Sequence, residues 1–304
     1  MHALQLIYHE GYDLHFGDHV FPSIKYKLIR ERMLAEGFAA ETDFIAPSPA
    51  DDEDLLLVHD RSWVTRLKHG TLSYHEILQL EIPYSRPMVD GFWLAAGGTT
   101  LAARCALKHR AAYNVGGGFH HAFHAHGEGF CAIHDVAVAI RVLQKEKVIE
   151  RALVVDVDVH QGNGTASIFA GDPSVYTLSI HQFNNYPQQK PPSTVDIHLE
   201  DDTADEEYLE RLGKAVETAL DEHQPQLLMY VAGADPYEQD KLGGLLLTLD
   251  GLYKRDVMVM EAAFRRGVPV CITLAGGYAM KLEDTVTIHT NTAKAAVEAL
   301  RRTN

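Results

Sequence analysis

The chain has 304 residues, 46% of them hydrophobic, and its 27 Lys and Arg against 42 Asp and Glu give a formal net charge of −15 at pH 7. This composition is typical of a folded globular protein and excludes disordered, collagenous and coiled-coil chains. The acidity argues against a nucleic-acid surface, which needs clustered Lys and Arg. It is compatible with solubility alone or with a cationic substrate such as a lysine-rich peptide or a polyamine.

The number of cysteines and the N-terminal sequence bear on the cellular compartment of the protein. Cys105, Cys131 and Cys271 are too few and too scattered for a disulfide framework or a cysteine-based zinc site. The first ten residues have neither the basic nor the long apolar region of a signal peptide, and no apolar run approaches the 18 residues of a membrane span. We therefore expect a cytoplasmic protein that does not bind a membrane.

Two helices are expected in the first third of the chain. Residues 24–36 place Ile24, Leu28 and Ala35 on one face, and Gly37 follows as a C-terminal stop. Residues 86–107 form an Ala-rich stretch that predicts a second, longer helix.

From residue 111 onward, short apolar runs alternate with polar loops and amphipathic helices. The runs span residues 152–159, 175–180, 227–232 and 268–274. They are nearly continuous and β-branched, as expected of parallel strands that are covered on both faces. No linker, repeat or low-complexity segment divides the chain. We therefore predict an α/β fold in which residues 1–304 form a single domain, with a mostly parallel sheet flanked by helices on both faces.

Reactive side chains follow the predicted strands, each near a carboxyl end. They are His120, His121, Asp158, His160, His181, Asp235 and Tyr278. Open α/β sheets build their sites at this edge, so we expect these residues to converge there.

The segment Val-Val-Asp-Val-Asp-Val-His at 154–160 predicts a cation site. Strand alternation would place Asp156, Asp158 and His160 on one side, where the carboxylates would repel and be desolvated unless a cation compensated them. Asp235 in Gly-Ala-Asp-Pro is the best third ligand beside Asp158 and His160. This mixed N/O set with an open position suits catalytic Zn²⁺, with Fe²⁺ or another divalent metal also open. The alternative is strand-end polar groups satisfied by loop backbone, with Asp235 as an ordinary loop or N-cap residue.

Two glycine-rich segments carry the remaining chemistry. Three glycines at 116–118 precede His120 and His121, so the backbone can approach a bound group closely and the two rings can act as proton carriers. Tyr278 follows Gly276 and Gly277, on a turn from which its phenol can donate to a developing oxyanion.

Together these motifs resemble the histone deacetylase family of the arginase–deacetylase fold, over residues 4–296. The resemblance rests on Gly-Gly-Phe-His-His-Ala at 117–122, Gly-Phe-Cys at 129–131, Asp-Val-Asp-Val-His-Gln-Gly-Asn-Gly at 156–164, Ser-Ile-His at 179–181, Gly-Ala-Asp-Pro at 233–236 and Gly-Gly-Tyr at 276–278.

The resemblance implies a role for each matched residue. The zinc ligands would be Asp158, His160 and Asp235, and the metal would polarise the amide carbonyl and activate water. His120 and His121 would be general base and general acid, and Tyr278 the oxyanion donor. Asp156 would orient His120.

The resemblance also implies cation and substrate sites. A structural K⁺ would be held by Asp156, Asp158, His160, Ser179 and Ile180, and a second monovalent cation by Phe169, Asp172 and Val175. Phe130, next to Gly129, would line one wall of the acyl-lysine tunnel and Tyr186 the other. Glu81 is a candidate for the acidic rim group that grips the substrate backbone.

One position departs from the common family pattern. Many members carry Asp where this chain has Asn163, and that aspartate pairs with the second histidine. Asn163 accepts a hydrogen bond but brings no charge, so we expect a lowered pKa at His121 and a shifted pH–rate profile in Asn163→Asp. The His-Gln-Gly-Asn-Gly variant resembles class IV histone deacetylases and their bacterial relatives, in which long-chain acyl removal accompanies or exceeds deacetylation.

The resemblance therefore implies a zinc-dependent deacylase acting on N-acyl-lysine in peptides or proteins, in the manner of a bacterial stand-alone enzyme. An acetylpolyamine amidohydrolase shares this chemistry. A binuclear-manganese ureohydrolase shares the fold but needs further bridging Asp and His residues, where this chain has Asn163 and the segment 233–238. A non-catalytic acyl-lysine reader is disfavoured, because such a protein would not need the complete set of ligands, histidines and tyrosine.

Overall fold

The computed structural model describes residues 4–303 of the chain. Its strands are β1 (Gln5–Ile7), β2 (Phe44–Ile45), β3 (Ala111–Asn114), β4 (Ala152–Asp156), β5 (Val175–Gln182), β6 (Val195–Leu199), β7 (Leu227–Val231) and β8 (Val270–Thr273). Its α-helices are α1 (Lys25–Ala35), α2 (Asp52–Leu55), α3 (Arg61–His69), α4 (Tyr74–Leu80), α5 (Arg86–His109), α6 (Asp135–Lys145), α7 (Asn163–Ile168), α8 (Asp205–His223), α9 (Leu249–Arg265) and α10 (Leu282–Arg302).

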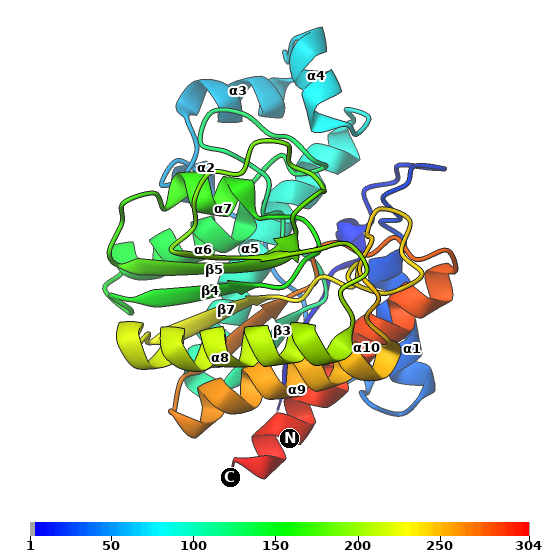
Figure 1. Cartoon of the computed structure of the whole chain (residues 1–304). Helices are drawn as coiled ribbons and strands as arrows, with labels where there is room; N and C mark the ends of the chain where they lie inside the picture. The colour runs from blue at the N-terminus through cyan, green and yellow to red at the C-terminus, as the bar shows by residue number, and fades with distance from the viewer. Residues whose placement is uncertain (1–3, 304) are drawn as a thin grey trace.

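Within these residues the strands form one eight-stranded sheet in the order β2-β1-β3-β8-β7-β4-β5-β6. Every neighbouring pair of strands is parallel. Helices α5, α6 and α7 lie on one face, and α8, α9 and α10 on the other (Figure 1). The predicted mostly parallel sheet with helices on both faces is confirmed.

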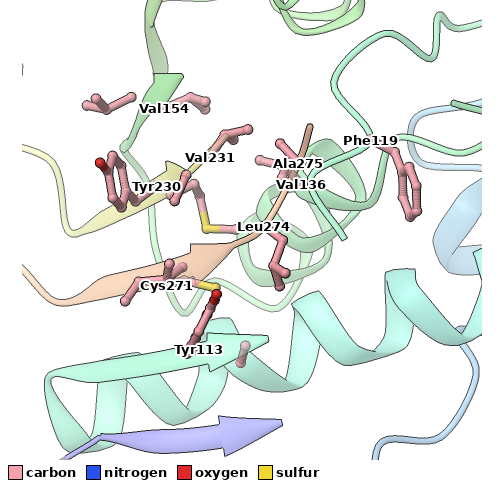
Figure 2. Close-up of a cluster of buried hydrophobic side chains, with 14 of the residues drawn as sticks. Tyr113, Phe119, Val136, Val154, Tyr230, Val231, Cys271, Leu274 and Ala275 are labelled. Atoms are coloured by element: carbon pink, nitrogen blue, oxygen red, sulfur yellow. The ribbon is translucent and has the colours of Figure 1, made fainter. Parts of the chain in front are cut away.

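The sheet is apolar because both of its faces are covered. All five residues of β4 and of β7 are buried, as are all four of β3 and β8. Figure 2 shows buried side chains on three neighbouring strands, among them Tyr113 on β3, Tyr230 and Val231 on β7 and Cys271 on β8. This burial explains why the sequence shows near-continuous apolar runs. It also makes the sheet a rigid support for the loops at its edge.

Local signals explain where the helices begin. Ser85 accepts a hydrogen bond from the backbone N–H of Met88 at the start of α5, and a proline occupies the first turn. Ser73 and Glu76 form a reciprocal capping box at α4. In the described part of the chain, no helix combines the length and apolarity needed to cross a membrane.

The structure corrects one step of the sequence reasoning. Strand β4 ends at Asp156, although the apolar run continues to Val159. Strand alternation therefore does not apply to Asp158 and His160, which lie in the irregular loop after β4. Val157 and Val159 are apolar because this loop is fully buried, not because it is a strand.

Candidate active site and metal site

Four adjacent strands, in the spatial order β3-β8-β7-β4, carry the reactive loops at their carboxyl ends. The loop after β3 carries His120 and His121, the loop after β8 carries Tyr278, and the loop after β7 carries Asp235. Asp158 and His160 follow β4. Because parallel strands end at the same edge, these loops meet although their residues are far apart in sequence.

Asp158, His160 and Asp235 form a compact buried cluster whose potential ligand atoms all lie within 4.8 Å of one another. His160 Nδ1 lies 3.0 Å from Asp158 Oδ1 and 3.5 Å from Asp235 Oδ2. The backbone N–H of Gly276 donates to Asp158 Oδ2 at 2.8 Å, and that of Val159 donates to Asp235 Oδ1 at 2.8 Å. Backbone groups thus fix both carboxylates.

The electrostatics of this cluster fit a cation. Burial and the neighbouring Asp158 charge raise the pKa of Asp235 to about 7. Burial opposes protonation of His160, but its hydrogen bond to Asp158 and the nearby Asp235 carboxylate outweigh that effect and raise its pKa to about 10. Asp235 Oδ2 is buried without a hydrogen-bond partner. One nitrogen and two carboxylates, one with an unpaired oxygen, fit a divalent metal ion.

The two tandem histidines have contrasting partners. His120 Nδ1 lies 2.7 Å from Asp156 Oδ2, and His121 Nδ1 lies 2.7 Å from Asn163 Oδ1. Burial opposes a charge on His120, but Asp156 and Asp158 overcome it and raise the pKa to about 9. Burial, with the nearby His120 and His160, holds the pKa of His121 well below its ordinary value. At neutral pH the pair therefore consists of a positively charged His120 ring and a neutral His121 ring, with centroids 3.9 Å apart.

Tyr278 is held at the side of the cluster by its backbone. Its N–H donates to Asp240 Oδ2 at 2.6 Å, and the preceding Gly277 has a φ of +139°, which favours glycine. Burial, with the charges of Asp158 and Asp235, raises the pKa of the phenol well above its ordinary value. The hydroxyl therefore stays protonated and can donate a hydrogen bond.

These side chains open into a cavity of 440 Å³. Phe130 and Tyr186 line it, as do Phe21 and Leu242, and Glu81 lies at its mouth with an exposed side chain. The absence of a side chain at Gly129 lets the cavity wall approach His121 and Tyr186 closely. A Cβ at this position would lie 2.9 Å from the ring of His121 and 3.0 Å from that of Tyr186. The cavity is thus an aromatic channel that ends at the histidines and the carboxylates.

The residues expected to bind K⁺ lie close to the sheet. Ser179 and Ile180 belong to β5, and Ser179 is the register partner of Asp156 on β4. The second set lies in the turn between α7 and β5, where the Phe169 carbonyl accepts from the backbone N–H of Asp172 at 3.1 Å and the Asp172 carbonyl accepts from Val175 at 3.3 Å. The side chain of Asp172 pairs with Arg141 at 2.6 Å, so a guanidinium already supplies positive charge beside it.

The structure removes one expected residue from the site and adds others. His181 lies within β5, and its ring bonds Ser179 Oγ and His198 rather than lining the cavity. Lys25 was missed, since a lysine in the first turn of a helix gives no sign of burial. Its Nζ donates to the Ala275 carbonyl at 2.7 Å, and burial lowers its pKa to about 8.

Glu128 was also missed, although the Gly-Phe-Cys motif directly follows it. Its carboxylate accepts hydrogen bonds from Asn163 Nδ2 at 2.6 Å and from the Tyr186 hydroxyl at 2.7 Å. A glutamate next to a motif has no distinguishing spacing, so only the fold reveals this contact.

Comparisons with known proteins agree on one family. A profile of the histone deacetylase domain matches residues 19–293. An uncharacterized protein of Picosynechococcus is 38% identical over 292 residues, covering 96% of this chain and 97% of the relative. Histone deacetylase 2 of Arabidopsis thaliana is 31% identical over 288 residues, covering 90% of this chain and 74% of the relative. The crystal structure of a histone deacetylase homolog from Aquifex aeolicus gives a TM-score of 0.82 at 25% identity, covering 96% of this chain and 84% of that one.

Proposed function

Because the chain belongs to the histone deacetylase family and has its arginase–deacetylase fold, we propose that it hydrolyses the amide bond of N-acyl-lysine in peptides or proteins. The observation that carries this proposal is the completeness of the site. A cluster suited to a metal, two tandem histidines and a protonated tyrosine all border one aromatic cavity. A protein that only binds acyl-lysine would not need this set.

Asp158, His160 and Asp235 would hold Zn²⁺, with Fe²⁺ as the alternative. When bound, such an ion supplies Lewis acidity toward the substrate carbonyl and the attacking water. The acylated lysine side chain would extend between Phe130 and Tyr186, which exclude water from its apolar stem. A structural K⁺ at the backbone of Asp156, Asp158, His160, Ser179 and Ile180 belongs to the same proposal.

The side chains of the chain itself perform the proton transfers. The resemblance implies one histidine as base and the other as acid; in this proposal His121 takes both roles instead. With Nδ1 of His121 donating to Asn163 Oδ1, its Nε2 is the free basic nitrogen and accepts a proton as a water molecule attacks the carbonyl carbon. The Tyr278 hydroxyl and the positive charge of His120 stabilise the tetrahedral oxyanion. The amide C–N bond then breaks, and the proton carried by His121 passes to the leaving lysine nitrogen. The products are a carboxylate and a free amine.

The test is release of amine from matched lysine peptides that carry acetyl, lactyl, octanoyl or myristoyl groups, with zinc-loaded protein. Tyr278→Phe removes the oxyanion donor and should lower kcat by roughly 100- to 1,000-fold. Tyr176→Phe, on β5 and outside the cavity, is the matched control and should keep its activity. Equal activity of Tyr278→Phe and the wild type would refute this mechanism, and the best acyl group would define the branch of the family.

Hydrolysis of acetylated polyamines is the second candidate. It is favoured by the net charge of −15 and by the exposed Glu81 carboxylate at the cavity mouth, which could bind a distal ammonium group. An acetylated polyamine in the same assay separates the two. Turnover of the polyamine with none of any peptide would select this second function.

A further inference from the structure

A chain of hydrogen bonds runs from His121 to a carboxylate that the family motif does not contain. His121 Nδ1 contacts Asn163 Oδ1 at 2.7 Å, and Asn163 Nδ2 donates to Glu128 Oε1 at 2.6 Å. The second oxygen of Glu128 accepts from Gln79 Nε2 at 3.3 Å and lies 3.2 Å from His126 Nε2. Each oxygen of Glu128 therefore has defined partners.

The direction of this chain follows from the chemistry of its groups. An ionised carboxylate only accepts hydrogen bonds, so the amide NH₂ of Asn163 must face Glu128. The amide oxygen must then face His121, and the backbone N–H of Gly164 donates to the same oxygen at 3.0 Å. His121 in turn must donate from Nδ1, which leaves Nε2 unprotonated toward the cavity. Burial tends to raise the pKa of Glu128, but its hydrogen bonds outweigh this and lower it, so the group is ionised at neutral pH.

We propose that Glu128 is a positioning residue that orients the Asn163 amide and thereby fixes the tautomer of His121. Many family members carry a carboxylate at position 163. This chain has its carboxylate on Glu128 instead, which reaches His121 through the Asn163 amide. Glu128 is held for this task, because its backbone exchanges hydrogen bonds with Cys131 in both directions at 3.1 and 2.9 Å. This inference rests on the proposed function where it is tested by enzyme kinetics. Its test by NMR needs only the geometry described above.

A second contact of Glu128 connects the same carboxylate to the cavity wall. The Tyr186 hydroxyl donates to Oε1 at 2.7 Å, and the Tyr186 ring stands edge-on to His121 with centroids 4.9 Å apart at 89°. Tyr186→Phe removes only this branch, because it leaves the bond between Asn163 and Glu128. We expect Tyr186→Phe to change KM more than kcat, whereas loss of the Asn163 branch should change kcat.

A charge swap tests the coupling. Asn163→Asp alone sets two carboxylates face to face at hydrogen-bond distance, and Glu128→Gln alone removes the charge but keeps an acceptor. In the double variant the new amide can donate to the new carboxylate, which accepts from His121. We expect kcat to fall about 100-fold in Asn163→Asp and about threefold to tenfold in Glu128→Gln, and to return to within about tenfold of the wild type in the double variant.

If the kcat losses of the two single variants multiply in the double variant, the proposal is overturned. Multiplied losses mean that Asn163 and Glu128 act independently, whereas a direct contact between them predicts rescue. Thermal unfolding of each variant shows whether it is folded. An inactive wild type would instead refute the proposed function, and the following measurement would still decide the present inference.

Nitrogen-15 NMR of the zinc-loaded full chain reports the tautomer directly. The His121 signals are assigned by their loss in His121→Gln. We expect the Nδ1–H form in the wild type and a mixture of the two tautomers, or exchange between them, in Glu128→Ala. An Nε2–H form in the wild type, or an unchanged Nδ1–H form in Glu128→Ala, would overturn the role of Glu128.

Discussion

Gly276→Ala should weaken metal binding without unfolding the protein. A Cβ at this position would lie 1.9 Å from Asp235 Oδ2 and 2.6 Å from Asp158 Oδ2. Contacts below 3.0 Å are not seen for real Cβ atoms, so the Asp235 oxygen must move by more than 1 Å. Positive φ in this turn falls on Ala275 and Gly277 and not on Gly276, so the expected effect is a clash with the two proposed ligands and not backbone strain.

The carboxylates cannot easily yield to this methyl group. Asp235 is held through its other oxygen by Val159, and Asp158 Oδ2 is held by Gly276 itself. Metal sites tolerate ligand shifts of only about 0.2 Å. Displacing a ligand by several times that distance should cost at least the 10- to 100-fold in metal affinity that loss of a supporting contact typically costs, or about 1.4–2.8 kcal/mol.

The measurement is competition for Zn²⁺ between the metal-free protein and a chromophoric chelator. Gly213→Ala in α8 is the matched control, because its new methyl group meets only the flexible end of Met258, with Sδ at 3.0 Å. This control should bind metal like the wild type and, as a glycine replaced within a helix, gain roughly 0.5–1 kcal/mol of stability. An unchanged Kd for Zn²⁺ in folded Gly276→Ala would refute Asp158 and Asp235 as the ligands.

Two further predictions concern protons. Zn²⁺ binding at pH 8 should release close to one proton, because His160, with a pKa of about 10, must deprotonate to become a ligand. The affinity for Zn²⁺ should therefore rise with pH toward 10. Calorimetry in buffers of different ionisation enthalpy measures the number of protons released, and a value of zero would contradict this prediction. Lys25→Met should stabilise the protein at pH 7 by up to about 3 kcal/mol, because folding lowers the Lys25 pKa from 10.5 to about 8 and the folded state carries the cost of a buried charge. That gain should shrink as the pH rises from 8 to 10.5; chemical denaturation that shows a constant or opposite difference would contradict it.

The sequence predicted the interior of the fold better than its edges. Helix α5 begins at Arg86 as predicted, and α1 differs from its predicted bounds by one residue at each end. The central strands were found because both of their faces are buried, which leaves continuous apolar runs. The edge strands β2 and β6 and the three-residue strand β1 beside β2 were not predicted, since they are short or only half-buried. Strand ends were placed too late wherever a buried loop continued the apolar run.

Motif residues and their supporting residues differ in how far the sequence reveals them. Asp158, His160 and Asp235 have characteristic spacing, and the strand ends predict where they meet. Lys25 and Glu128 act through contacts with residues far away in the sequence, at Ala275 and at Asn163. No local pattern encodes such a pairing, because either residue type is ordinarily exposed at a helix start or in a loop.

A buried arginine side chain bridges the two loops that carry the proposed metal ligands Asp158 and Asp235. Arg255 of α9 is fully buried, and its Nη1 donates to the Gly233 carbonyl at 2.8 Å and lies 3.4 Å from the Val157 carbonyl. These carbonyls belong to the two loops that carry Asp235 and Asp158. Asp256 balances the guanidinium at 2.9 Å and also accepts from the Tyr230 hydroxyl of β7. A buried ion pair is costly to desolvate and adds little net stability, so its value lies in holding two backbones at a set distance. Helix α9 thus holds the loops of Asp158 and Asp235 in place through a side chain of the protein itself.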